Sequence, residues 1–255
     1  MISYPNVKVN LGLSVLRKRE DGFHELETVF LPYNEISDIL EINPSDEFGI
    51  EIFRAEGVDW DPMQDLTAKA YRLLKDAYDI PPMKIRLTKR SPVGAGLGGG
   101  SSDAAFALRM MSELAGLGLD DATLASFAAR LGSDCAFFVY NTPMLGKGRG
   151  EILSPIDVDL GGHQLKVVVP EGISVSTKEA YGGIVPRERS GFVQDPLPEL
   201  LSRPVEEWKE LVVNDFETTV FAAHPELARI KQSLYDAGAV YASMSGSGSA
   251  IFGIW

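Results

Sequence analysis

The sequence has few of the features that mark secreted, membrane-spanning or zinc-binding proteins. Its 255 residues include one cysteine, Cys135, so no disulfide can form within the chain, and we expect a protein of the reducing cytoplasm. No apolar run approaches the about 20 residues that span a bilayer. The first residues lack a basic segment followed by an apolar one, so we expect no signal peptide and no membrane partner. No histidines and cysteines have zinc-ligand spacing, and we expect no protein-bound metal.

Positive charge is also scarce. The formal net charge of −12 at pH 7 argues against a nucleic-acid partner, because surfaces that bind nucleic acid are usually basic. A nucleotide ligand stays possible, since a phosphate group needs only a few local positive charges and Lys89 and Arg90 precede a glycine-rich segment. With 45% apolar and 24% charged residues, the chain can bury a sizeable core in one large domain or two smaller ones.

The segment PVGAGLGGGSS, residues 92–102, is the most informative stretch that is present. Its five glycines are Gly94, Gly96, Gly98, Gly99 and Gly100. Glycine reaches backbone conformations closed to other residues and lets main-chain N–H groups approach a ligand. Ser101, Ser102 and Asp103 are typical N-cap residues, and apolar residues at helical spacing follow as far as residue 114. Because a helix N-terminus offers free N–H groups and the positive end of the helix dipole, this segment predicts a phosphate-binding loop.

Other interpretations of the glycine loop fit less well. The pattern G-x-G-x-x-G at Gly94, Gly96 and Gly99 also matches the dinucleotide fingerprint. That fingerprint needs a second parallel strand after the helix, whereas residues 120–132 look helical, so we disfavour a dinucleotide oxidoreductase. The Walker A motif is absent. Five glycines within seven positions argue against a purely structural turn.

The remaining pattern predicts a mixture of strands and helices. Strands are expected at 6–16, 24–33, 38–42, 49–53, 84–89 and 164–170, and helices at 67–78, 104–114, 121–132 and 226–237. The short apolar run CAFFVY, residues 135–140, predicts a strand or a buried turn. Residues 157–164 are turn-rich and predict a domain junction, and the proline-rich residues 186–204 predict a surface excursion. Residues 239–255 predict a strand, a small-residue turn and a strand.

Several single residues could carry chemistry, but each also has an ordinary structural interpretation. Lys8 lies between Val7 and Val9, and a lone strand lysine is usually exposed to solvent. Asp134 fits either a turn residue or a partly buried carboxylate that a lysine keeps charged, and sequence spacing alone does not bring it to Lys8. A lone histidine such as His24 is more often a surface residue than a catalyst. Cys135 is expected in the core rather than as a nucleophile.

Three segments in this order resemble the motifs of the GHMP small-molecule kinases. They are PNVKVNLGL with Lys8, SPVGAGLGGGSSDAA, and MSGSGSAIF near the C-terminus. DGFHELETVF, LGSDCAFF and GKGRGEIL extend the resemblance over the whole chain, and the combination is far more specific than any one piece. The resemblance implies an α+β, two-domain fold. Residues 1–157 would form an ATP-binding domain like domain 2 of ribosomal protein S5, and residues 158–255 a ferredoxin-like domain.

The resemblance also implies a reaction and the residues that carry it. The protein would use ATP, with Mg²⁺, to phosphorylate a hydroxyl of a small molecule that carries a cytidine diphosphate. By motif position, Asp134 is implied as general base or hydroxyl-orienting carboxylate and Lys8 as its charge partner. The implied ATP-binding residues are Asp65, Lys89, Pro92, Gly94, Gly96, Leu97, Gly98, Gly99, Gly100, Ser101 and Ser102. The family usually has asparagine at the position of Asp65, so this chain departs there from the family's pattern on the adenine side of the nucleotide.

The implied substrate-binding residues lie in other segments. They are Asn10, Phe23, His24, Thr177 and Tyr181. His24 would hydrogen-bond the cytosine edge while Phe23 and Tyr181 stack on opposite faces of the base. The family usually has tyrosine in place of Phe23, so stacking is retained and a hydroxyl contact is lost.

The sequence leaves some alternatives open. Lys147 and Arg149 fit either neutralisation of phosphate or a solvated turn. A family member acting on mevalonate, homoserine or a sugar is disfavoured by the DGFHEL segment. A non-catalytic binding protein of the same fold is disfavoured because Lys8 and Asp134 are both present. A monomer and a homodimer are equally compatible with the sequence.

Overall fold

The computed structural model describes residues 1–190 and 195–255, and this part of the chain divides into two compact units. Unit 1 consists of Met1–Lys8, Pro32–Val93 and Gly98–Thr142. Unit 2 consists of Val9–Leu31, Gly94–Leu97 and Pro143–Trp255. Each unit is therefore assembled from three segments of the chain, and the domain bounds 1–157 and 158–255 stay a prediction.

The sheet of unit 1 has the strand order β1-β4-β6-β5. Its strands are β1 (Ile2–Ser3), β4 (Ile39–Pro44), β5 (Gly49–Arg54) and β6 (Met83–Lys89). All neighbours are antiparallel except β5 and β6, which run parallel. A parallel pair needs a crossover connection, and helix α1 (Leu66–Tyr78) lies in it. Alternate residues of β6 are buried, as the two-residue period of its sequence predicts.

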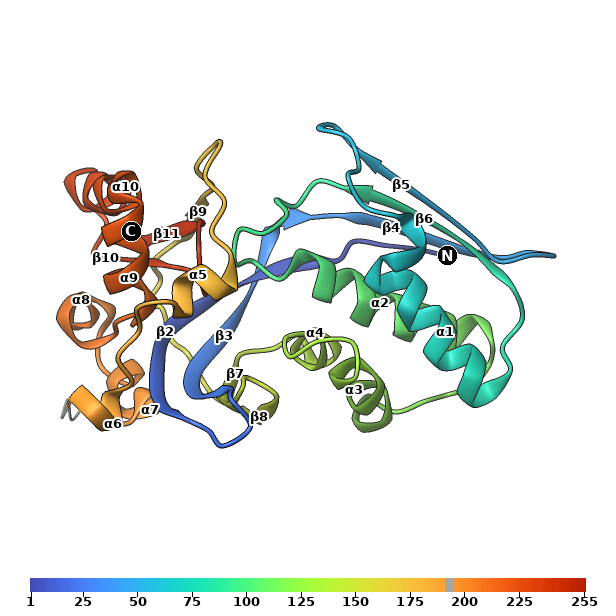
Figure 1. The fold of residues 1–255 in the computed structure, drawn as a ribbon, viewed down its shortest axis with the longest axis horizontal. Helices are drawn as coiled ribbons and strands as arrows, with labels where there is room; N and C mark the ends of the chain where they lie inside the picture. The colour runs from blue at the N-terminus through green and yellow to red at the C-terminus, as the bar shows by residue number, and fades with distance from the viewer. Residues whose placement is uncertain (191–194) are drawn as a thin grey trace. The chain divides into compact units, whose positions relative to one another are not determined.

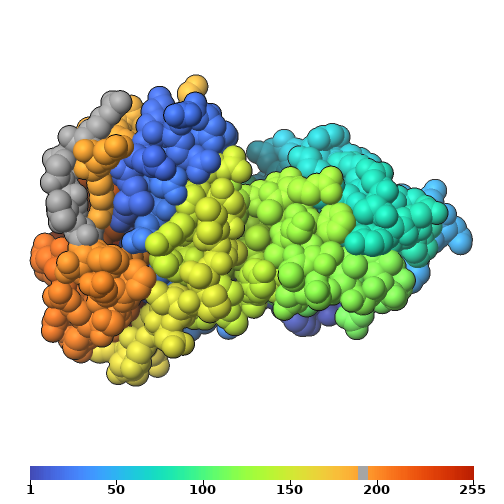
Figure 2. Space-filling model, turned by 90° about the horizontal axis from the view of Figure 1, so that it is seen from below, coloured from blue at the N-terminus to red at the C-terminus, as the bar shows by residue number. Residues whose placement is uncertain are grey.

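Helices pack on this sheet and on one another (Figure 1). Besides α1 they are η1 (Pro62–Gln64), α2 (Gly99–Leu114), α3 (Asp121–Ala129) and α4 (Cys135–Tyr140). α2 packs against α1, α4 and β4. On the face shown in Figure 2, the cyan and green residues of these helices form the surface of unit 1. The expectation of a strand or turn at residues 135–140 is wrong, because this run is helix α4, which ends at Asn141 in the left-handed conformation.

Unit 2 holds a second and a third sheet. One has the order β2-β3-β7-β8, and the other the order β10-β11-β9. The strands are β2 (Asn6–Lys18), β3 (His24–Ser37), β7 (Met144–Gly148), β8 (Ile152–Pro155), β9 (Leu165–Val168), β10 (Tyr241–Met244) and β11 (Ile251–Ile254). Strands β2 and β3 are long enough to contribute residues to both units.

The described helices of unit 2 are α5 (Thr177–Tyr181), α6 (Arg187–Ser190), α7 (Leu197–Leu201), η2 (Val205–Glu207), α8 (Trp208–Leu211), α9 (Phe216–Ala223) and α10 (Pro225–Asp236). Among them, α5, α9 and α10 share a core with β2 and the three-stranded sheet. The expected surface excursion at 186–204 is partly wrong, because Leu197, Leu200 and Leu201 are buried. Residues 191–194 of that stretch lie outside the described residues. Among the described helices, none has the length and apolarity needed to cross a membrane.

Candidate active site

Lys8 and Asp134 meet in unit 1, although 126 positions separate them in the chain. The ammonium of Lys8 lies 3.4 Å from Asp134 Oδ2, and the exposed fractions of the two side chains are 3% and 33%. Lys8 stands on β2, and Asp134 immediately precedes α4. Burial lowers the pKa of Lys8, and the neighbouring carboxylate of Asp134 opposes that shift. The pair thus combines a buried cation with a carboxylate that solvent and substrate can reach.

The second half of the glycine loop opens helix α2 in unit 1. Gly98 is the N-cap residue with φ of 72°, and no side chain caps the helix, so its first N–H groups stay available to an anion. A Cβ on Gly98 would lie 3.0 Å from Phe138 and 3.2 Å from Lys8 Cε. Only a glycine therefore lets the loop pass this close to Lys8. Gly98 and the Lys8–Asp134 pair therefore lie close together in unit 1.

The first half of the loop belongs to unit 2, where it packs against the small-residue turn between β10 and β11. The carbonyl of Ala95 accepts a 3.0 Å hydrogen bond from the Ala250 N–H, and Ser245 Oγ donates to the Gly96 carbonyl. A Cβ on Gly96 would lie 2.2 Å from the carbonyl oxygen of Ser245. The glycine-loop motif and the C-terminal MSGSGSAIF motif are therefore in direct contact.

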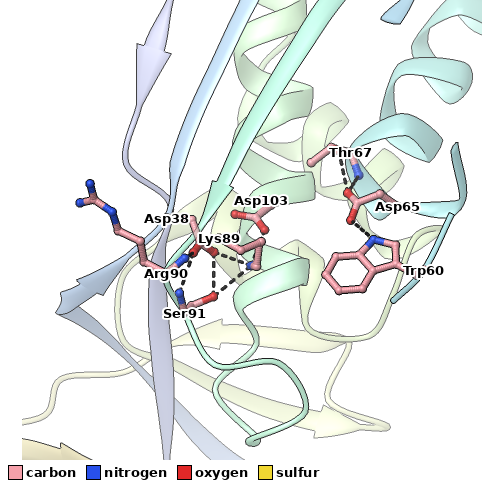
Figure 3. A network of polar contacts seen from close by, with 8 residues as sticks. All are labelled: Asp38, Trp60, Asp65, Thr67, Lys89, Arg90, Ser91 and Asp103. Atoms are coloured by element: carbon pink, nitrogen blue, oxygen red, sulfur yellow. Dashed lines mark hydrogen bonds and ion pairs between the residues drawn. The ribbon is translucent and has the colours of Figure 1, made fainter. Parts of the chain in front are cut away.

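Lys89 and Asp65, which the sequence assigned to ATP, already have protein partners in unit 1 (Figure 3). The Lys89 ammonium donates to Asp38 Oδ2, to Ser91 Oγ at 3.0 Å and to Asp103 Oδ2 at 2.7 Å. Asp65 caps α1 by accepting from the N–H and hydroxyl of Thr67. Its other oxygen accepts from the Trp60 indole at 3.2 Å. Direct contact of these two residues with ATP stays a prediction.

The other loop residues assigned to ATP differ in exposure. Gly94 and Gly100 are exposed, whereas Leu97, Gly99 and Ser102 are buried. Pro92 and Ser101 are half-buried. The loop therefore presents mainly backbone, which suits recognition of phosphate by N–H groups.

Aromatic side chains gather in unit 2 around the segment expected to bind the nucleobase. The rings of His24 and Tyr181 stack with centroids 4.7 Å apart and planes 18° apart, and Phe216 contacts Tyr181 edge-on. Partial burial lowers the pKa of His24, and Lys18 adds to this shift, so the ring is neutral at pH 7. Phe23 is exposed over 53% of its surface. The structure thus brings His24 and Tyr181 together, and Tyr181 stacks on the His24 ring itself.

Asn10 and Thr177 lie in different environments within unit 2. Asn10 is buried, and its amide donates a 3.0 Å hydrogen bond to Thr28 Oγ1. Thr177 is exposed at the start of α5, four residues before Tyr181. Their contact with a substrate stays a prediction.

Arg149, for which the sequence left two interpretations open, contacts Phe23. Its guanidinium carbon lies 4.8 Å from the centroid of the Phe23 ring, in the turn between β7 and β8. Lys147 lies on β7, with its ammonium 3.5 Å from Glu27 Oε2. Arg149 therefore lies over Phe23 and also has Glu151 Oε1 at 3.7 Å from its Nε, while Lys147 pairs with Glu27.

Sequence patterns missed two carboxylates, Asp38 and Asp103. Both are fully buried beside Lys89 and the start of α2. Asp38 precedes an ordinary strand, and the sequence indicates Asp103 only as an N-cap residue. The available signal for these two carboxylates is Lys89, which lies on a strand just before the glycine loop. A lysine that is buried there needs acidic partners.

Comparison with known proteins decides the family. The description "GHMP kinases N terminal domain" matches residues 65–142, and "GHMP kinases C terminal" matches residues 197–255. A curated relative from Bacteroides thetaiotaomicron, named 4-diphosphocytidyl-2-C-methyl-D-erythritol kinase, is 46% identical over 100% of this chain and 92% of its own length. The chain belongs to the GHMP kinases. The family predicted from the sequence motifs is confirmed, and membership makes the chain a small-molecule kinase.

Solved GHMP kinase structures agree with the fold. A crystal structure titled 4-(cytidine 5'-diphospho)-2C-methyl-D-erythritol kinase matches with a TM-score of 0.83 and 33% identity, covering 100% of this chain and 90% of that one. The mevalonate kinase of Methanococcus jannaschii matches with a TM-score of 0.74 at 15% identity, over 100% of this chain and 90% of its own, and shows the fold alone. The predicted α+β, two-domain GHMP fold is therefore confirmed.

Proposed function

We propose that this GHMP kinase transfers the γ-phosphoryl group of ATP to the 2-hydroxyl of 4-diphosphocytidyl-2-C-methyl-D-erythritol, a step toward isoprenoid precursors. Full-length relatives with 42–46% identity carry the name of this activity. The observation that carries the chemistry is the contact of Lys8 with Asp134 beside the glycine loop. A cytoplasmic location goes with this biosynthetic role.

Asp134 orients the acceptor hydroxyl and accepts its proton. A carboxylate 33% exposed can reach a substrate, and Lys8 beside it compensates its charge in a site from which water is partly excluded. The buried ammonium also faces the position where negative charge develops during transfer. Phosphoryl transfer needs little covalent chemistry from the protein, so positioning and electrostatic stabilisation account for most of the rate.

The glycine loop binds the phosphates of ATP, which enters as its Mg²⁺ complex. The uncapped N-terminus of α2, from Gly98 to Ser101, supplies backbone N–H groups and the positive end of the helix dipole. Asp65 precedes Leu66, whose side chain lies near Gly100 of the loop, and is the candidate for an adenine contact. In the part of the chain that the structure describes, no group of three or more histidine, cysteine, aspartate or glutamate side chains is placed to hold a metal ion.

The cytosine base of the second substrate binds in unit 2, at the aromatic group of Phe23, His24 and Tyr181. A neutral His24 ring can donate and accept hydrogen bonds along a base edge. Phe23 offers an exposed ring face for stacking, and Arg149 on that ring adds a positive charge suited to a diphosphate.

A coupled assay of ADP release tests the proposal. The wild type should release ADP with 4-diphosphocytidyl-2-C-methyl-D-erythritol and not with mevalonate or homoserine. Asp134→Ala should lower kcat by about 10²–10⁴-fold, the usual contribution of a positioned base. Asp120→Ala removes an exposed carboxylate that caps α3 and should keep the wild-type kcat, as a matched control. No ADP release by the wild type contradicts the activity, and near-normal turnover by Asp134→Ala contradicts the role of Asp134.

A further inference from the structure

Four polar side chains form a buried cluster beneath the glycine loop in unit 1. Asp38, Lys89, Ser91 and Asp103 point toward one another in Figure 3, while Arg90 points away. The exposed fractions of the Asp38, Lys89 and Asp103 side chains are 0%, 4% and 1%. The cluster thus joins the end of β6 and the chain just before β4 to the first turns of α2.

Asp38 holds the chain at the point where β6 ends and the glycine loop begins. Its Oδ1 accepts the backbone N–H groups of Arg90 at 2.5 Å and Ser91 at 2.7 Å. Its Oδ2 accepts from Ser91 Oγ at 2.7 Å and from the Lys89 ammonium. A single carboxylate therefore receives four hydrogen bonds from three consecutive residues.

The Lys89 ammonium is fully used within the cluster. It has three N–H donors, and Asp38, Ser91 and Asp103 supply three acceptors. An ammonium in this state has no donor left for a phosphate or a base. In this conformation Lys89 bears on the nucleotide site through the loop that it holds, and a direct contact with ATP would require one of these three hydrogen bonds to break.

The cluster touches the loop backbone at the residue that begins α2. A Cβ on Gly99 would lie 2.2 Å from Ser91 Oγ and 3.3 Å from Lys89 Nζ. On the neighbouring residue, a Cβ of Gly98 would lie 3.2 Å from Lys8 Cε. Two adjacent glycines are thus packed between the cluster and the buried lysine of the Lys8–Asp134 pair.

We propose that Asp38, acting through Ser91, Lys89 and Asp103, is a positioning residue that fixes Gly98 and Gly99 at the distance from Lys8 that phosphoryl transfer requires. The inference rests on the proposed function, because it takes the loop as the phosphate site. The charges fit: one ammonium faces two carboxylates. Burial raises the pKa of Asp103 well above its usual range, although the Lys89 ammonium opposes that shift.

Asp38→Asn tests the proposal, because an amide N–H₂ would face the Ser91 hydroxyl and the Lys89 ammonium, which are both donors. We expect ATP to bind about ten times more weakly in calorimetry, given the usual worth of hydrogen bonds to a charged group. Displacement of the loop should also lower kcat in the ADP-release assay by about 10- to 100-fold. Amide hydrogens of residues 93–102 should exchange faster.

Ser91→Ala is the milder second variant, which keeps the test decisive if Asp38→Asn does not fold. It removes one hydroxyl from the cluster and should shift ATP affinity and kcat in the same direction, by less. Asp120→Asn, an exposed capping carboxylate of α3, is the matched control and should change neither.

The outcomes separate this inference from the proposed function. A wild type that does not bind ATP contradicts the proposed function. A wild type that binds ATP, with both variants folded and equal to it in ATP affinity, kcat and loop exchange, overturns the positioning role. A lower melting temperature alone, with unchanged ATP affinity and kcat, also overturns it, because a merely structural cluster would give that result.

Discussion

At the scale of single residues, the site depends on two buried lysines whose charge is balanced differently. Lys8 faces one half-exposed carboxylate, and burial lowers its pKa. Burial also acts against charge on Lys89, but Asp103 and Asp38 outweigh it, so its pKa is raised. The charged form of Lys8 is therefore the less stabilised of the two, and the charged form of Lys89 the more stabilised.

Gly98→Ala should weaken both the fold and the reaction. The residue has φ of 72°, which costs an L-residue about 1–2 kcal/mol, and the new Cβ would crowd Phe138 and Lys8. Urea unfolding should show at least this loss, and kcat should fall because Lys8 is displaced. Gly100→Ala is the stability control, since its Cβ would meet nothing closer than Leu66 at 4.0 Å. Equal stability of the two variants would contradict the packing described.

Asp103→Asn should change how stability depends on pH. Between the ordinary value of 3.8 and the raised pKa of Asp103, the folded protein holds a proton that the unfolded chain has lost. The contribution of Asp103 to the free energy of unfolding of the wild type therefore falls as pH rises through that window. Asparagine cannot titrate, so in urea unfolding the variant should gain stability relative to the wild type as pH rises from 3.8 through that raised pKa. A constant difference across this range would contradict a protonated Asp103.

Long-range contacts explain which site residues the sequence could indicate. Lys8, Asp134 and the glycines stand in recognisable motifs, although only the fold brings Lys8 to Asp134. Asp38 stands before an ordinary strand, and its partners lie about 50 positions away, so nothing local separates it from a surface aspartate. Burial, which decides its role, is a property of the folded unit and not of the segment.

At the scale of elements, periodicity predicted long segments better than short ones. The alternation in β6 and the helical spacing in α1 and α2 each extend over enough residues to choose between strand and helix. The six residues of α4 are apolar throughout, and a run of that length fits a buried strand or a buried helix equally. The prolines of 186–204 suggested a surface segment, yet α7 buries three leucines there.

Asp65 allows its role in helix α1 to be separated from a role in ATP binding. Asp65→Ala removes the N-cap and should cost about 0.5–2 kcal/mol in urea unfolding. Asp65→Asn keeps a capping oxygen and should retain most of that stability. If Asp65 also contacts adenine, Asp65→Asn will change ATP affinity in calorimetry while stability stays near that of the wild type. Unchanged affinity in a stable Asp65→Asn would restrict the residue to capping α1.

At the scale of the whole molecule, the net negative charge of the chain is compatible with sites that bind anions. The chain carries a net charge of −12, yet the groups that would meet phosphate are backbone N–H groups, a helix N-terminus and a few lysines and arginines. Affinity for ATP therefore depends on local geometry rather than on overall charge. The net negative charge of the chain also makes nonspecific attraction of polyanions weak.

MgATP should raise the thermal midpoint of the whole protein, and NAD should not. A ligand at 100 times its Kd adds about 2.7 kcal/mol to the free energy of unfolding when it binds only the folded state. Thermal unfolding with each nucleotide at equal concentration measures this. Stabilisation by NAD alone would favour the dinucleotide interpretation of the glycine loop.

The burial of Lys8 and Lys89 also has a consequence for covalent labelling. Their side chains are 3% and 4% exposed, whereas Lys147 is 53% exposed. An acylating reagent of lysine amines should therefore modify Lys147 early and these two amines last. The rate at which adducts accumulate on Lys8 and Lys89 would then report how fast unit 1 opens. Mass spectrometry of the individual peptides would measure that rate.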